Sequence, residues 1–146
     1  MFSRVVFSSN SDHWATPAVV YEELNREFKF SFDPCPLNSS VDGLKCSWSG
    51  TVFCNPPYSK IQQFINKGLW HLASREAKLL CYLLPARTDT AWFHDYCLKA
   101  TEIRFLRGRL KFGNAKSNAP FPSMVVIFKQ WAIPTGQEKT GRLPTV

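Results

Sequence analysis

The sequence predicts one α/β domain in which helices pack on the faces of a mostly parallel sheet. Strand-like apolar runs alternate with amphipathic helical segments along the chain, as they do in βα units. Residues 79–84 are apolar without interruption, which is typical of a central parallel strand that is buried on both faces. The most conspicuous polar and turn-forming sequences directly follow predicted strands, and an open α/β sheet binds its ligands at that edge.

The first half of the chain contains two predicted helices and two predicted strands. Thr16 and Pro17 begin the first helix, with Thr16 as N-cap and Pro17 as first helical residue. Residues 29–32 form a short strand, and residues 51–54 form the next one. The second helix starts at Ser59, where a Gln three residues later completes a capping-box pattern.

The second half continues the alternation. The buried strand at residues 79–84 is followed by a helix whose apolar face extends over residues 93–100. A further strand contains Ile103 and Phe105, and the last strand covers residues 124–128. We expect this last strand to be antiparallel to the others.

Length and composition indicate one domain over residues 1–133 and a flexible tail over residues 134–146. The 146-residue chain is 45% hydrophobic and 20% charged, which is too apolar for a disordered protein. It has no run long enough to span a membrane and no signal peptide, so we expect a cytoplasmic protein without a membrane partner. Its net charge of +7 favours a polyanionic partner, of which nucleic acid is the simplest.

The five cysteines predict neither a disulfide framework nor a metal site. Their number is odd, and no two have the C-x-x-C spacing. Cys54 and Cys81 lie within strand-like apolar runs, so we expect them to be small core residues.

The motif Asn55-Pro56-Pro57-Tyr58, at the end of the strand 51–54, predicts a site that methylates a planar amino group such as adenine N6. The Asn55 side-chain oxygen and the Pro56 carbonyl can accept hydrogen bonds from the two N–H groups of the amine. The amine nitrogen then directs its lone pair at a methyl donor. The prolines keep the carbonyls aimed because they fix φ. Tyr58 offers a flat face for stacking, worth roughly 1–3 kcal/mol per base. The alternative is a Pro-rich turn between a strand and a helix.

The basic segment from residue 107 to residue 122 predicts a DNA-binding loop. It is long for a connection in a compact domain, and it starts at the same edge of the sheet as Asn55. Its cations suit phosphate contact and its aromatic residue suits stacking, although a solvated basic loop is the alternative. The predicted DNA-binding residues are Lys60, Arg87, Arg107, Arg109, Lys111, Phe112 and Lys116.

Taken in order, several segments resemble the phage and prophage DNA N-6-adenine methyltransferases. They cover the chain from about Trp14 to Phe128. The segments are residues 14–17, 32–36, 42–44, 53–59, 84–90, 108–112 and 120–123.

The resemblance implies a reduced Rossmann-like methyltransferase domain in a bacterial host cell, encoded by a phage or prophage. It implies S-adenosylmethionine as donor, no metal, and adenine N6 in double-stranded DNA as acceptor, with base flipping into the Asn-Pro-Pro-Tyr site. Asp33 matches the acidic residue that binds the methionine part of the donor, and Asp42 matches one near its adenosine. The implied donor-binding residues are Trp14, Thr16, Pro17, Asp33, Pro34, Cys35 and Asp42.

The chain departs from the superfamily in its donor region. The stretch from Asp33 to Asn55 is too short for two strand–helix units found in larger enzymes, and Pro34-Cys35-Pro36 replaces a Gly-rich turn. A second subunit that completes the donor site, in a homo-oligomer, is one consequence that stays open. The open alternatives for function are RNA adenine-N6 methylation, protein glutamine methylation, and a catalytically impaired DNA-binding descendant.

Overall fold

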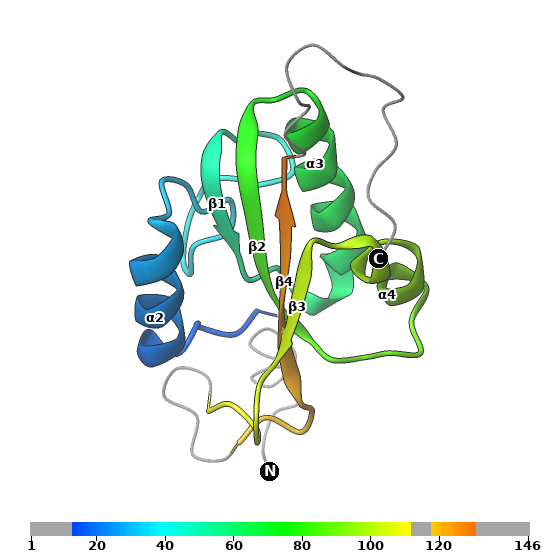
Figure 1. Ribbon diagram of the computed structural model, residues 1–146. Coiled ribbons are helices and arrows are strands. Elements are labelled where there is room, and N and C mark those ends of the chain that lie inside the picture. The colour runs from blue at the N-terminus through cyan, green and yellow to red at the C-terminus, as the bar shows by residue number, and fades with distance from the viewer. Residues whose placement is uncertain (1–12, 112–117, 131–146) are drawn as a thin grey trace.

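The described residues, 13–111 and 118–130 of this computed structural model, form a mixed sheet with helices on both faces (Figure 1). None of the helices among them is long and apolar enough to cross a bilayer. In chain order the elements are α2 (Ala18–Phe28), β1 (Gly50–Cys54), the 3-10 turn Tyr58–Lys60, α3 (Ile61–Ala73), β2 (Ala77–Pro85), α4 (Ala91–Asp95), the 3-10 turn Cys97–Lys99, β3 (Glu102–Phe105) and β4 (Ser123–Lys129).

The four strands are arranged in the order β1-β2-β4-β3. β1 pairs parallel with β2, whereas β4 pairs antiparallel with both β2 and β3. The expected antiparallel last strand is confirmed. The expected mostly parallel pairing is not what the sheet shows, because β4 lies between β2 and β3 and leaves one parallel ladder. β1, β2 and β3 nevertheless all run in the same direction.

The predicted strand at residues 29–32 is only a single parallel bridge between Phe32 and Val52. The end of α2 explains the shortening. Lys29 caps this helix in the left-handed conformation, with φ of 56°, and the Asn25 side chain accepts a hydrogen bond from the backbone N–H of Phe30. Lys29 and Phe30 therefore belong to the helix cap, and only Ser31 and Phe32 reach β1.

The predicted helix starts are also shifted. α2 begins after Pro17, without a side-chain cap, and the Thr16 hydroxyl is used elsewhere. α3 begins after Lys60, whose side chain forms no cap, so the helix does not start at Ser59 as predicted. The helix predicted over residues 93–100 is broken into α4 and a 3-10 turn.

Alternating side chains of the central strands divide the core into two clusters. Leu80, Tyr82 and Leu84 of β2 pack with α3 and α4, which lie on the right in Figure 1. Cys81 and Leu83 face the other way and pack with α2 on the left. The predicted core cysteines, Cys54 and Cys81, are confirmed as fully buried.

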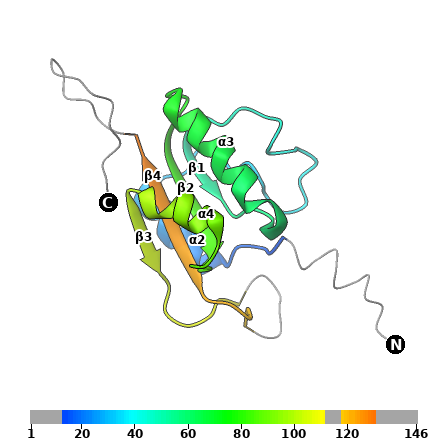
Figure 2. The ribbon, with the colours of Figure 1, turned by 90° about the vertical axis from the view of Figure 1, so that its right-hand side faces the viewer.

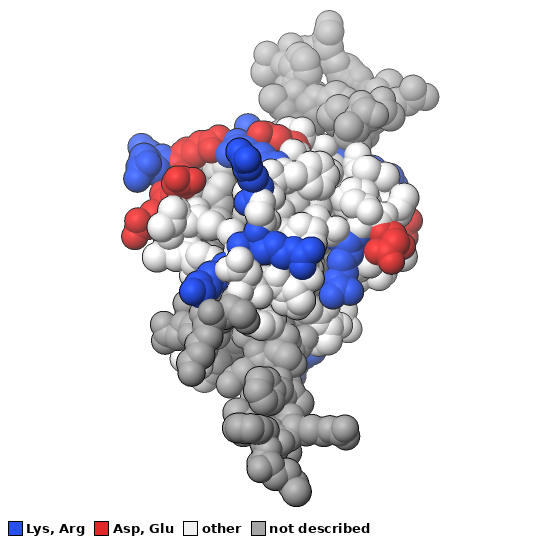
Figure 3. All heavy atoms as spheres, turned by 90° about the horizontal axis from the view of Figure 1, so that it is seen from below, with Lys and Arg blue, Asp and Glu red and all other residues white. Residues whose placement is uncertain are grey.

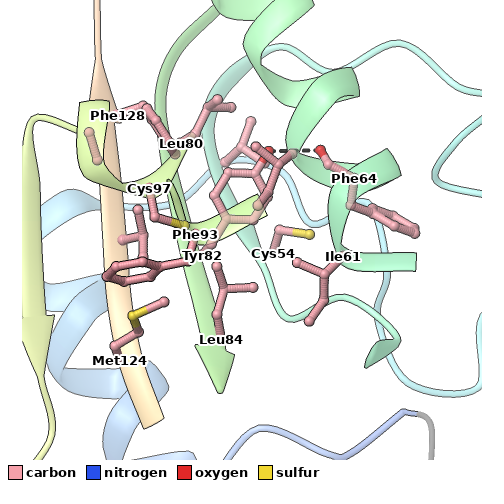
Figure 4. Close-up of a cluster of buried hydrophobic side chains, with 14 of the residues drawn as sticks. Cys54, Ile61, Phe64, Leu80, Tyr82, Leu84, Phe93, Cys97, Met124 and Phe128 are labelled. Atoms are coloured by element: carbon pink, nitrogen blue, oxygen red, sulfur yellow. Dashed lines mark hydrogen bonds between the residues drawn. The ribbon is translucent and has the colours of Figure 1, made fainter. Parts of the chain in front are cut away.

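α3 lies unusually close to the sheet at Gly68. The Tyr82 hydroxyl donates a hydrogen bond of 2.9 Å to the Phe64 carbonyl one turn earlier (Figure 4). A Cβ atom at Gly68 would overlap that hydroxyl and would lie 2.8 Å from the Trp48 ring. Only glycine fits this approach, which sets the distance between α3 and β2.

We expect Gly68→Ala to destabilise the protein, although Ala is the better helix former. The added methyl group overpacks a rigid site, at a cost of about 1–3 kcal/mol in the free energy of unfolding. Chemical denaturation of the variant and the parent measures this difference. Asn66→Ala on the exposed face of α3 is the control, and Gly68→Ala combined with Tyr82→Phe should lose less than the sum of the single changes. A Gly68→Ala variant as stable as the parent would contradict the close approach.

Candidate active site

The carboxyl ends of β1, β2 and β3, which several of the predicted site residues follow, lie at one edge of the sheet, toward the bottom of Figure 1. Asn55 follows β1, Arg87 lies just after β2, and Arg107 lies just after β3, and these strands run in the same direction. Asp33 follows Phe32, which pairs parallel with β1. The expected convergence at the carboxyl ends of the strands is therefore present, despite the mixed pairing.

Asn55 is held in one orientation by the segment that precedes α2. Its side-chain nitrogen donates to the Trp14 carbonyl at 2.6 Å and to the Thr16 hydroxyl at 3.0 Å. The Trp14 carbonyl can only accept, so the amide nitrogen must be the atom on that side. The opposite oxygen, Oδ1, is buried and has no hydrogen-bond partner among the described residues. Because a buried unpaired acceptor is costly, this oxygen is ready to accept an N–H group from a ligand.

The next residues of the motif form a stiff turn that leads into α3. Pro56 is buried, and no described residue donates a hydrogen bond to its carbonyl. The Pro57 carbonyl accepts the backbone N–H of Lys60 at 2.9 Å, which starts the 3-10 turn. The Pro56 carbonyl and Asn55 Oδ1 are thus two acceptors on adjacent residues.

Tyr58 is packed against Phe121, which precedes β4. The two ring centroids are 5.1 Å apart and the rings meet at 78°, an edge-to-face arrangement. Burial raises the pKa of the Tyr58 hydroxyl, so the side chain stays neutral. The sequence predicts no separate role for Phe121, although its position between two prolines at the end of a long loop is a signal for one.

A pocket of about 180 Å³ lies next to the motif on the α3 side. Of the predicted donor-binding residues, Pro34, Cys35 and Asp42 line it, whereas Asp33, Trp14, Thr16 and Pro17 do not. Two further residues line it. These are His13, for which the sequence predicts no role, and Lys60, which the sequence predicts to bind DNA.

The two predicted acidic residues differ in their surroundings. Burial raises the pKa of the Asp33 carboxyl, and the N–H group of Cys35 partly offsets this through a 2.9 Å hydrogen bond. Within the described ranges, Asp33 forms no salt bridge with Lys or Arg. Asp42 is exposed and accepts a hydrogen bond from the backbone N–H of Leu44 at 2.9 Å. Asp33 is therefore the carboxyl group that would gain more from a cationic ligand.

Two cysteines lie together beneath Asn55. The sulfur atoms of Cys35 and Cys54 are 3.5 Å apart, and the Cys35 thiol also donates to the Asn55 carbonyl at 3.2 Å. The hydrogen bond with Cys54, and a second one with His13, lower the pKa of Cys35 to about 7. The pKa of His13 is raised, chiefly by the same hydrogen bond, whereas burial raises the pKa of Cys54.

Several exposed cations are spread over this edge of the molecule. Figure 3 shows Lys and Arg side chains across the middle of the face and Asp and Glu side chains at its margin. Five of the predicted DNA-binding residues are exposed, and the other two, Phe112 and Lys116, lie outside the described residues. The exposed residues are Lys60, Arg87, Arg107, Arg109 and Lys111.

Within the predicted DNA-binding loop at residues 107–122, the Ala119 N–H group donates a hydrogen bond to the Leu110 carbonyl, at 2.8 Å. Both of these residues pack in the α2-side cluster together with Phe121. The base of the loop is therefore anchored on the same side of the sheet as Tyr58.

Within residues 13–111 and 118–130, no group of three or more His, Cys, Asp or Glu side chains is arranged to hold a metal ion.

A family model described as DNA N-6-adenine-methyltransferase (Dam) matches residues 5–141. No curated protein matches the chain, and no solved structure does.

We expect the alkylation rate of Cys35 by iodoacetamide to rise with pH and to reach half its maximum near pH 7. The thiolate is the nucleophile, and a lowered pKa makes it available above that pH. Peptide mass spectrometry after timed alkylation measures the rate at each cysteine. Cys54→Ala removes the main hydrogen bond to the thiolate, so the midpoint should move up toward the ordinary thiol value. A midpoint for Cys35 near the ordinary thiol value of about 8.5 would contradict this.

Proposed function

The chain belongs to the DNA N-6-adenine-methyltransferase family, and we propose that it transfers a methyl group from S-adenosylmethionine to N6 of adenine in double-stranded DNA. The observation that carries the proposal is the buried, unpartnered Oδ1 of Asn55. It stands beside the Pro56 carbonyl, at the edge of the sheet where ligands bind.

Asn55 and Pro56 act on the amino group of the target base. Asn55 Oδ1 accepts a hydrogen bond from one N–H group of the amine, and the Pro56 carbonyl accepts a hydrogen bond from the other. With both hydrogens held, the nitrogen becomes pyramidal and its lone pair leaves the plane of the ring. The acceptors are in place before the base arrives, so little reorganisation is needed in the transition state.

Tyr58 supplies the stacking surface for the flipped base. Its neutral, half-buried ring is kept in place by the edge-to-face contact with Phe121. Removing the base from the duplex costs a few kcal/mol, and stacking on an aromatic ring offsets a part of that cost.

The residues beside the motif fit a part of the donor. Asp33 offers a desolvated carboxyl for the ammonium group, and Pro34, Cys35, Asp42 and His13 surround the adjoining space. S-adenosylmethionine, when bound, supplies an electrophilic methyl group. The pocket of about 180 Å³ is smaller than the roughly 300–1,000 Å³ of sites that enclose a whole small molecule.

Trp14 and Thr16 have a different role from the one that the resemblance implied. Both accept hydrogen bonds from the Asn55 amide nitrogen, so we assign them to the orientation of Asn55. Pro17, which follows them, is the N-cap of α2 and joins the segment to the helix.

The exposed cations at this edge bind the phosphates that flank the flipped base. The chain leaves the sheet after β3 through Arg107, Arg109 and Lys111, and Arg87 lies just after the end of β2. Phosphate contacts carry no sequence information of their own but position the duplex over the site.

We expect Asn55→Ala to lower methyl transfer to DNA by at least ~100-fold, the loss typical of removing one preorganised electrostatic group. Incubation with donor labelled in its methyl group, together with duplex DNA, RNA or cell protein, measures the transfer. Calorimetric titration with donor should give a similar dissociation constant for variant and parent. Asn66→Ala, an exposed asparagine of α3, is the matched control. If RNA or protein becomes labelled and DNA does not, the proposed acceptor is wrong. Near-normal turnover of Asn55→Ala would refute the proposed chemistry.

Replacing Arg107, Arg109 and Lys111 together by Ala should weaken DNA binding and flatten its dependence on salt. Each lost phosphate contact lowers the slope by about 0.9, so the slope should fall by about 3. Binding isotherms at several salt concentrations measure it. The matched control replaces Arg75, Lys78 and Lys129, three exposed cations at the opposite edge of the sheet. Equal slopes for the two triple variants would show that the basic segment does not contact the DNA backbone.

A further inference from the structure

Cys35 and Cys54 lie close enough together to form a disulfide. Their sulfur atoms are 3.5 Å apart, and a disulfide bond is about 2.05 Å long, so the contraction is about 1.5 Å. The parallel bridge between Phe32 and Val52 holds the two segments together, and the Phe53 N–H group donates to the Phe32 carbonyl at 3.0 Å. The pair is thus built into the sheet edge.

The two thiols differ in access. Cys35 is half-buried and lines the pocket, where His13 and Lys60 are also present. Cys54, in contact with it, is completely buried. A reagent therefore meets Cys35 first, and Cys54 is the second thiol.

The surroundings of Cys35 favour the reactive thiolate. Hydrogen bonds from Cys54 and His13 stabilise it, whereas the Asp33 carboxylate and burial oppose it. The balance lowers the pKa of Cys35 to about 7, so a large fraction is ionised near neutral pH.

The other three cysteines lack this arrangement. Cys81 and Cys97 are buried, and burial raises the pKa of each to about 12. Cys46 is half-buried, and its thiol donates to the Gly43 carbonyl at 3.6 Å. Among the described residues, Cys35 and Cys54 are the one pair of sulfur atoms within hydrogen-bonding distance.

We propose that Cys35 and Cys54 form an oxidisable dithiol that a hydroperoxide converts to a disulfide. The Cys35 thiolate attacks the O–O bond of the hydroperoxide, which is reduced to an alcohol or water, and the sulfur becomes a sulfenic acid. The Cys54 sulfur then attacks this sulfur. The S–S bond forms, and hydroxide leaves with the proton of Cys54 as water. A reducing dithiol restores both thiols.

This disulfide inhibits the site, a consequence that rests on the proposed function. The Cys35 thiol donates a hydrogen bond to the Asn55 carbonyl, and the backbone N–H group of Cys35 donates one to the Asp33 carboxyl. Cys54 directly precedes Asn55 in the chain. To form the bond, the distance between the two sulfur atoms must shorten by about 1.5 Å. A catalytic group must be held within roughly 0.5 Å of its working position, so this movement is too large for the site. Oxidation therefore displaces both the acceptor of the target amine and the carboxyl proposed for the donor.

The test treats the full-length protein with hydrogen peroxide and maps peptides without reduction. The expected product is a peptide pair joined through Cys35 and Cys54, two hydrogens lighter than the free thiols and released by dithiothreitol. Methyl transfer to DNA is measured on the same samples, and we expect a loss of at least tenfold that dithiothreitol reverses. Circular dichroism before and after treatment checks that the fold is retained.

Variants separate the pair from general oxidation. Each variant is compared with its own untreated sample. Cys35→Ser and Cys54→Ser should form no linked peptide and should keep their activity in peroxide. Cys46→Ser, the matched control, should respond as the parent does.

Two results would overturn the proposal. One is the absence of the linked peptide while another cysteine is oxidised first. The other is a disulfide that leaves methyl transfer unchanged, which would remove the inhibition. A protein that forms the disulfide but methylates no DNA even when reduced would refute the proposed function and would leave the dithiol established.

Discussion

The candidate site depends on the two hydrogen bonds from the Asn55 amide nitrogen to Trp14 and Thr16. They join the start of the described chain to the end of β1, about forty positions further on. Because they use the nitrogen, they leave the oxygen buried and unpaired. The unpaired acceptor lowers the free energy of unfolding, and the rest of the fold offsets this, chiefly through the burial of β1 between the two core clusters. A binding group that is in place before its ligand arrives carries such an energetic penalty.

The position of β4 explains how a small mixed sheet retains a ligand-binding edge. An antiparallel strand between β2 and β3 lets β3 run in the same direction as β1 and β2. Their carboxyl ends, with the motif, the Arg87 turn and the basic segment, therefore stay on one side. The same strand brings Phe121, just before its start, against Tyr58. A two-stranded parallel core is thus enough to build the edge.

The shortened region before β1 gives the site its other distinctive features. In place of further strand–helix units, the chain has one parallel bridge and a loop that lines a small pocket. This loop brings Cys35 against Cys54 and His13, and it leaves Asp33 with its carboxyl partly buried. The reduction in size has therefore placed a thiol pair next to the group proposed to hold the target amine. Chemistry at that pair is coupled to the site through the shared backbone of Cys54 and Asn55.

The sequence by itself determined the strands β1 to β4, the antiparallel direction of the last one, and the edge at which the motifs meet. These follow from local apolar runs and from the positions of the motifs just after them, which are properties of short segments. It could not determine the strand order, the failure of residues 29–32 to form a strand, or the true partners of Thr16. Thr16 was expected to cap a helix and instead binds Asn55, because a distant buried amide competes successfully for its hydroxyl. The close pairing of Cys35 with Cys54 likewise arises only when two segments come together, since contacts between distant residues have no signature in local spacing. Only the tertiary structure decides such contacts, because each depends on which groups are already satisfied elsewhere in the fold.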